Sequence, residues 1–317
     1  MESPSLPRCP RCAEPRILAP ECPRCGVLYA RARARTEPSA PEVPAGVSLP
    51  GLVEEPARAL RWTGEVEAAR DELRLRMWAL PAALGMMGVL TGTPLGRVLA
   101  RTFLSMWVHE LGHALTAWLC GFPALPGPWR TSIWEERSST VFALVAFVLM
   151  GAVFRGVLLR SRTWLLAGAG GLLLQCVGSV CLSTSTGRVL ITFGGDGGNF
   201  VLGTLLMLSP YAAPHSKLRR DWLHWGLLVI GAASFTDKFR DWWGARSDFG
   251  AMSFGIQEGT LSDTSKLVDQ YGWSEQALVE RYTTLALVCL AVLATVYVVG
   301  LWRARAALRA LEPARGG

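Results

Sequence analysis

An apolar stretch from Val98 to Gly121 is long enough to cross a membrane, and it contains the sequence His109-Glu110-Leu111-Gly112-His113. Apart from Arg101 near its start, the only charged residue in the stretch is Glu110. An ionisable side chain inside a membrane span is costly and indicates a functional site by default. The stretch therefore predicts a membrane helix whose polar side chains serve a specific chemistry.

The two histidines of this motif lie four residues apart, so a helix places both on one face, one turn apart. Imidazole nitrogens suit zinc, and a glutamate beside the first histidine can act as general base toward the attacking water. The pattern predicts that His109 and His113 bind a catalytic zinc ion and that Glu110 is the base. In a soluble chain it would indicate an ordinary zinc protease, whereas inside a membrane it indicates intramembrane proteolysis.

The composition is that of a membrane protein. Of 317 residues, 50% are hydrophobic and 18% charged, against about a quarter charged in soluble domains. The formal net charge is +7, but the basic residues lie between apolar segments, as membrane topology requires. We therefore expect an all-α polytopic membrane protein and no nucleic-acid partner.

The number of membrane spans is expected to be six, with seven as the alternative. The first apolar segment contains Pro81 and is short for a span, so it is the doubtful one. If it does not cross and the N-terminus is inside, Arg97 and the clusters at 155–162, 217–220 and 303–309 all fall on the cytoplasmic side. The candidate segments are 77–90, 98–120, 138–159, 164–182, 189–213, 222–236 and 282–302.

The N-terminal part predicts a second zinc site. Two Cys-x-x-Cys pairs in a polar segment supply four thiolates, which is the ligand set of a structural zinc ribbon over residues 1–30. Because this segment lacks a secretory signal pattern, we expect a cytoplasmic N-terminus with reduced thiols, and a docking role for a cytoplasmic partner is one interpretation of the ribbon. The four cysteines are Cys9, Cys12, Cys22 and Cys25.

The remaining organisation follows from composition. Residues 31–60 are rich in proline and predict a flexible linker, and residues 61–76 predict a juxtamembrane segment. Residues 77–317 form the predicted transmembrane domain, which includes a polar cap at 237–281 on the outer side.

The catalytic zinc needs a third protein ligand, because such sites usually use three and leave one position for water. Asp196 is the best candidate, since it lies among glycines within an apolar segment, and Asn199 one turn later is a possible donor to substrate. Helix rise places His109 about 12 Å and Asp196 about 10 Å from the starts of their segments, so both reach similar depth. A loop aspartate at the mouth of its segment is the alternative for Asp196. Asp237 and Asp263 are reserve candidates.

These two motifs in their membrane setting resemble the site-2 protease family of intramembrane zinc metallopeptidases, and the end of the chain is similar to a divergent bacterial branch. The resemblance implies that His109, His113 and Asp196 bind zinc, that Glu110 activates water, and that the protein lies in a bacterial inner membrane. The chain departs from the family pattern because no prolines precede Asp196 and an extra helix separates the two motifs.

The expected function is therefore an intramembrane zinc endopeptidase that cleaves membrane-embedded or membrane-anchored proteins. The alternative is a non-catalytic membrane scaffold or sensor with the zinc ribbon as an adaptor, which the departures around Asp196 favour. A transporter or lipid-modifying enzyme ranks last, because four histidines are too few for di-iron membrane hydroxylases and no inverted repeats are apparent.

Overall fold

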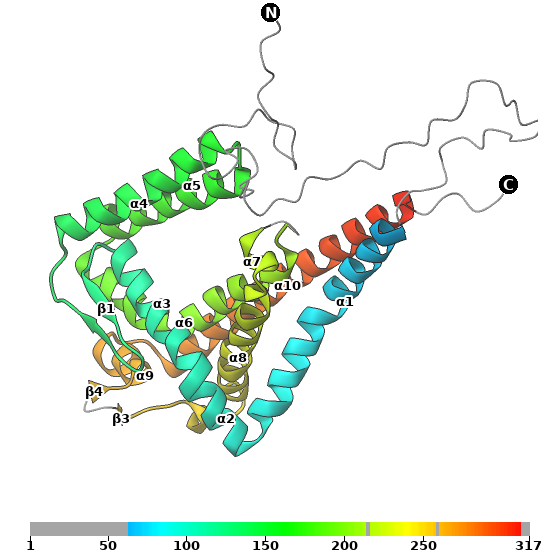
Figure 1. Ribbon diagram of the computed structural model, residues 1–317. Coiled ribbons are helices and arrows are strands. Elements are labelled where there is room, and N and C mark those ends of the chain that lie inside the picture. Colours follow the sequence, from blue (N-terminus) through cyan, green and yellow to red (C-terminus); the bar gives the residue numbers. More distant parts are fainter. Residues whose placement is uncertain (1–62, 214–215, 258–259, 312–317) are drawn as a thin grey trace, which may run out of the picture. The chain divides into compact units, whose positions relative to one another are not determined.

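The computed structural model describes residues 63–213, 216–257 and 260–311, and the predicted zinc ribbon and linker at 1–60 lie outside them. The described residues belong to one compact unit made mostly of helices (Figure 1). Five of their helices are long and apolar enough to cross a membrane. The protein is thus an all-α membrane protein, with the candidate spans at Gly64–Gly92, Ser139–Leu158, Arg162–Cys181, Thr184–Tyr211 and Glu275–Leu311.

Helix α1 (Thr63–Gly92) joins the predicted juxtamembrane segment and the doubtful apolar segment into one element. Its 30 residues correspond to about 45 Å of helix, and Pro81 lies inside it. The segment 77–90 is therefore too short to cross a membrane only when it is considered without the rest of α1. The helix that contains this segment is one of the five candidate spans, because it extends well beyond the apolar run, whereas we expected that 77–90 does not cross.

The two ends of α1 lie against different parts of the chain. Near its start, Glu72 pairs with Arg219 of α7 (Lys217–Arg220) at 2.6 Å. At its end, the Thr91 carbonyl accepts hydrogen bonds from Arg97 and Arg240, each at 3.4 Å. Arg97 and Arg219 thus lie at opposite ends of α1, although the charge argument placed both on one side of the membrane.

The segment that carries the histidines is built from three consecutive pieces. Helix α2 (Pro94–Ala100) begins at the N-cap Thr93, and a π-helical turn, η1 (Arg101–Ser105), leads into α3 (Met106–Leu119). The predicted span 222–236 corresponds to the first two thirds of α8 (Leu223–Gly244), with Trp222 as the N-cap. Neither α3 nor α8 is among the five candidate spans, so these two predicted spans are not supported by length and composition.

The core of this unit forms where α6 (Thr184–Met207), α8 and α10 (Glu275–Leu311) pack together with α1. Its largest fully buried side chains include Tyr282, Phe200, Phe235 and Met207. Phe200 and Phe235 pack edge to face with ring centroids 5.4 Å apart, and Tyr282 stacks on both Phe193 and Trp242. These contacts fix α6, α8 and α10 beside one another, and α6 in turn packs along α3, where the candidate site lies.

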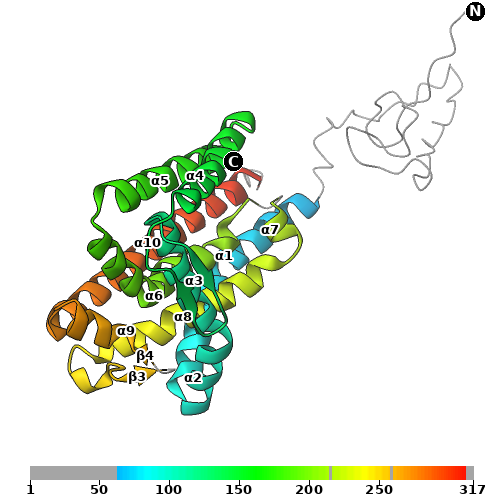
Figure 2. The ribbon, with the colours of Figure 1, turned by 90° about the vertical axis from the view of Figure 1, so that its left-hand side faces the viewer.

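A helical hairpin and a small sheet complete the other side of α3. Helices α4 (Ser139–Leu158) and α5 (Arg162–Cys176) pack on each other, and the π-helical turn η2 (Val177–Cys181) continues α5 (Figure 2). Between α3 and α4, strands β1 (Ala124–Pro126) and β2 (Thr131–Ile133) form an antiparallel pair. The pair runs alongside α3.

Short elements fill the chain between α8 and α10, where the sequence predicts a cap. They are the 3-10 turn η4 (Phe249–Ala251), strands β3 (Ile256–Gln257) and β4 (Thr260–Leu261), helix α9 (Asp263–Ser265) and the π-helical turn η5 (Lys266–Gln270). A further 3-10 turn, η3 (Ser209–Tyr211), follows α6. Contacts of α9 and η5 with α6 place the cap against the histidine-bearing region.

Candidate metal centre

Glycines bring α3 and α6 into backbone contact. A Cβ atom on Gly112 would overlap the Gly194 carbonyl oxygen, and one on Gly198 would lie 2.5 Å from the Gly112 Cα. A Cβ on Gly195 would lie 2.5 Å from His109 Cε1 and 2.6 Å from His113 Cε1. Residues with side chains are excluded at these positions, so the close approach of the two helices depends on the glycines.

The two histidines of α3 meet Asp263 of α9 in one cluster. The Nε2 atoms of His109 and His113 lie 3.2 Å apart, and Asp263 Oδ2 lies 3.2 Å from the first and 2.8 Å from the second. Tetrahedral zinc with ligand bonds of about 2.0–2.1 Å separates its ligand atoms by about 3.3 Å. The spacing and the donor types of the cluster therefore fit a zinc ion.

The outer nitrogen of each ring has an acceptor that fixes the ring's tautomer. His113 Nδ1 lies 2.7 Å from the Ile191 carbonyl oxygen, which can only accept, so Nδ1 carries the proton. His109 Nδ1 lies 3.0 Å from Asp196 Oδ1, and an ionised carboxylate accepts in the same way. Both Nε2 atoms then present lone pairs to the cluster. Histidines that bind metals are commonly held in this manner.

Asp196, the ligand expected from sequence, faces the opposite nitrogen of His109 from the cluster. Besides His109, it contacts Lys238 Nζ at 2.8 Å and accepts a hydrogen bond from Trp242 Nε1 at 2.9 Å. The structure thus places Asp196 where it orients a histidine, and places the reserve candidate Asp263 at the cluster. The other reserve candidate, Asp237, is buried and pairs with Arg101 at 2.8 Å.

Asp263 reaches the cluster because a short helix begins there. The Ser262 hydroxyl accepts a hydrogen bond from the backbone N–H of Ser265 and so caps α9. A metal ligand requires the ionised carboxylate, and Oδ2 of Asp263 is the oxygen that faces both imidazole rings.

Glu110 opens into a cavity of about 440 Å³ on one side of the cluster. His113 and Asp263 line the same cavity, together with all three residues of β2. The Thr131 hydroxyl donates to the backbone carbonyl of Glu110 at 2.9 Å and ties β2 to α3. The predicted base and two cluster residues therefore face one common space.

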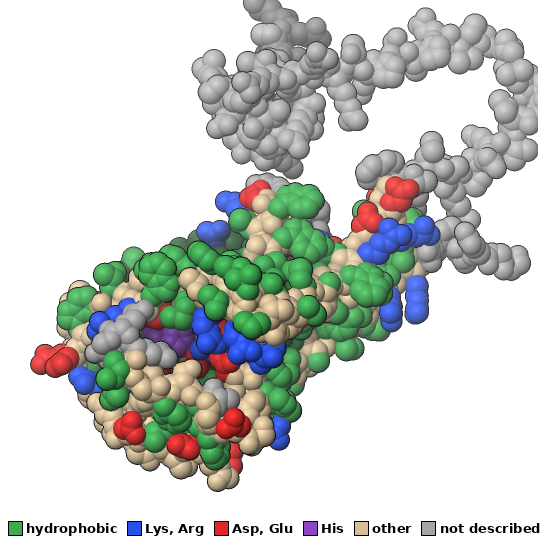
Figure 3. Space-filling model, turned by 90° about the horizontal axis from the view of Figure 1, so that it is seen from below, with side chains coloured by type: hydrophobic (Ala, Val, Ile, Leu, Met, Phe, Trp, Pro, Cys, Tyr) green, Lys and Arg blue, Asp and Glu red, His purple; other side chains and the backbone are tan. Residues whose placement is uncertain are grey.

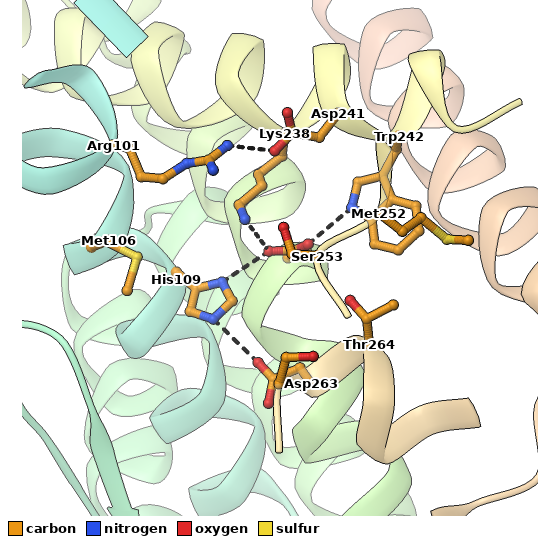
Figure 4. Close-up of a pocket in the computed structure, with 12 residues that line it drawn as sticks. Arg101, Met106, His109, Lys238, Asp241, Trp242, Met252, Ser253, Asp263 and Thr264 are labelled. Carbon is orange, nitrogen blue, oxygen red and sulfur yellow. Dashed lines mark hydrogen bonds and ion pairs between the residues drawn. The ribbon is translucent and has the colours of Figure 1, made fainter. Parts of the chain in front are cut away.

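A second cavity, of about 110 Å³, lies on the other side of the cluster. His109 and Asp263 line it, and Lys238 and Trp242 close it from α8 (Figure 4). Viewed from below, histidine surface lies in a hollow bordered by basic side chains (Figure 3). The cluster is thus accessible from outside the helix bundle.

The other residues expected from sequence have separate positions. Asn199 is fully buried, with its amide nitrogen 3.4 Å from His109 Nδ1, so it faces the ring and not a substrate space. His224 is buried and far along the chain from the cluster, and its carbonyl accepts from Ser209. His215 and the cysteine pairs lie outside the described residues.

Lys238 and Trp242 were not predicted from the sequence as site residues. A signal for Lys238 was present, because Asp237, Lys238 and Asp241 follow an apolar segment directly and are spaced as on one face of a helix. Read alone, such charges indicate a solvated helix end. Only the packing of α8 on α6 shows that Lys238 and Trp242 contact Asp196.

Comparisons with known proteins returned no match, whether against protein-family models, curated proteins or solved structures. The argument for function therefore depends on the site itself.

Proposed function

We propose that the protein is an intramembrane zinc metalloendopeptidase that hydrolyses peptide bonds of membrane-embedded or membrane-anchored proteins. The proposal depends on one observation, which is that three atoms able to act as lone-pair donors to a metal lie close together. His109 Nε2, His113 Nε2 and Asp263 Oδ2 lie within 3.2 Å of one another. Three acceptors at such distances repel each other unless a cation or additional protons lie between them.

Zinc is the cation that this donor set favours. Two imidazoles and one carboxylate form a common catalytic zinc set, and a fourth position stays open for water or substrate. Hard ions such as Mg²⁺ and Ca²⁺ prefer a shell of oxygen atoms. When bound, zinc would polarise the scissile carbonyl and make water a better nucleophile.

Glu110 is the proposed general base. Its side chain is buried, follows His109 directly in α3 and faces the same cavity as His113 and Asp263. It would accept a proton from the attacking water and then donate it to the leaving amine. Both transfers would take place within the 440 Å³ cavity, where His113 and Asp263 would hold the metal on the side of the base.

The position of strand β2 favours a peptide as the substrate. Among the residues that the structure describes, β2 pairs only with β1, and its residues line the Glu110 cavity. An extended peptide can add to such a free strand edge through main-chain hydrogen bonds. A helical peptide hides its carbonyls, so an extended segment is the form in which a membrane protein can present a bond to Glu110.

The proposal includes a bacterial inner membrane location with a cytoplasmic N-terminus. The start of α1 lies with Arg219, and the Tyr297 hydroxyl of α10 donates to the Met77 carbonyl at 3.2 Å. The basic ends of α7 and α10 therefore lie toward the start of α1, and such an excess of basic residues is typical of the cytoplasmic side.

The test is the zinc content of the full chain purified in detergent. We expect about two zinc ions per chain in the wild type, about one after Cys9, Cys12, Cys22 and Cys25 are changed to Ser, and none when His113→Ala is added. Protein that keeps its fold but holds no zinc without the cysteines would favour the scaffold or sensor alternative. Metal is reloaded before measurement, so that loss during purification is excluded.

A further inference from the structure

Lys238 is a cation that the proposed chemistry does not use. It lies on α8, its side chain is 14% exposed, and its Nζ is 2.8 Å from Asp196 Oδ1. A buried ammonium group is stable only when it is paired, and unpaired burial is strongly destabilising. The position of Lys238 beside the metal centre therefore needs an explanation, and its partner Asp196 provides one.

Asp196 is held from three directions. His109 Nδ1 contacts Oδ1 at 3.0 Å, Lys238 contacts the same oxygen, and Trp242 donates to Oδ2. The carboxylate is thereby fixed on the far side of the imidazole from the cluster. Figure 4 shows Lys238 and Asp263 on opposite sides of the His109 ring.

The other charges near Lys238 are already paired with each other. Arg101 binds Asp237 through two hydrogen bonds and also contacts Asp241. Within the described residues, Lys238 is thus the cation in contact with Asp196, and Arg101 serves the two carboxylates on α8. The charges named here thus form two groups, one of Lys238 with Asp196 and one of Arg101 with Asp237 and Asp241.

We propose that Lys238 is a positioning residue, which holds Asp196 on His109 Nδ1 and so leaves the third metal position to Asp263. This inference depends on the proposed zinc site and extends it. Without the ammonium group, the charge of the buried Asp196 carboxylate would not be compensated. The carboxylate, which contacts the proposed ligand His109, would then no longer be fixed on that imidazole ring. Loss of a residue that orients a metal-binding histidine typically weakens metal affinity 10–100-fold.

The experiment is a cobalt(II) titration of the full chain in detergent, in which absorption distinguishes a nitrogen- and oxygen-ligated site from a thiolate site. Lys238→Met is expected to weaken the nitrogen/oxygen site about 10–100-fold, and Lys238→Arg to restore most of this loss. Arg240→Met is the matched control, because Arg240 lies on the same helix, is exposed and contacts the Thr91 carbonyl instead of the site.

Folding is controlled by a second variant. Lys238→Met with Asp196→Asn removes both buried charges, so it avoids an unpaired carboxylate, and it should still bind cobalt(II) at least tenfold more weakly because a neutral amide orients His109 less well. Affinity within about twofold of wild type in this pair, or in a folded Lys238→Met protein, would overturn the inference. Absence of the nitrogen/oxygen site from the wild type itself would instead reject the proposed function.

Discussion

The two sides of the histidine–aspartate cluster differ in size and in chemistry. The Glu110 side is a cavity of about 440 Å³ bordered by a strand edge, whereas the Lys238 side is a cavity of about 110 Å³ surrounded by paired charges. The larger side has room for a peptide and carries the proposed base. The smaller side carries the groups that hold His109. In the proposed metal centre the Glu110 side would be the reacting side and the Lys238 side the supporting side, and the two sides should respond differently to substitution.

The largest effect is expected on the reacting side. Glu110→Gln should lower peptide cleavage by about 10²–10⁴-fold while the metal content stays unchanged, because the amide cannot accept the proton. The measurement is cleavage of a membrane-anchored substrate beside the zinc content of the same sample. Glu136→Gln is the control, since Glu136 is exposed. Full activity in Glu110→Gln would remove the distinction between the two sides.

The next largest effects are expected from substitution of the two aspartates near His109, which should differ in how far they weaken metal binding. Asp263→Asn should remove a metal ligand, whereas Asp196→Asn should weaken binding about 10–100-fold through His109. Equilibrium dialysis against zinc, with the four ribbon cysteines replaced, measures both. If Asp196→Asn abolishes binding and Asp263→Asn does not, the ranking obtained from sequence is correct and Asp196 is the ligand.

A methyl group next to the two imidazole rings should also weaken the proposed metal centre. In Gly195→Ala the new Cβ would lie about 2.5 Å from both imidazole rings, so the rings would have to move apart. We expect at least tenfold weaker zinc binding. Gly170→Ala introduces the same change where nothing lies within 4 Å and should bind zinc normally. Equal affinities in the two variants would show that the helices separate without affecting the cluster.

The smallest effect is expected when the hydrogen bond between β2 and α3 is removed. Thr131→Val removes the hydrogen bond to the Glu110 carbonyl and should destabilise the fold by about 1 kcal/mol. Ser132→Ala, on the same strand and exposed, should have less effect. Thermal unfolding in detergent with zinc present measures both variants. A larger loss for Ser132→Ala would mean that the strand is held by other contacts.

Much of the site was predictable because it depends on local spacing. Two histidines four residues apart on a helix share a face whatever surrounds them, and Glu110 follows from the same motif. The apolar segments likewise predict membrane helices from composition alone. Their ends were less predictable, as α1 shows. Its polar N-terminal part is also helical, and there Glu72 pairs with Arg76 at 2.6 Å and with Arg219, a residue distant in sequence.

The sequence by itself determined that this is a helical membrane protein with two histidines and a glutamate in a His-Glu-x-x-His pattern on one helix. The tertiary structure decided which carboxylate joins that motif. Asp196 and Asp263 are 67 residues apart, and both reach His109, one on each ring nitrogen. Which nitrogen each one meets depends on Lys238 and Trp242 from α8 and on the cap at α9. Such contacts between distant segments arise from packing, which no local pattern encodes.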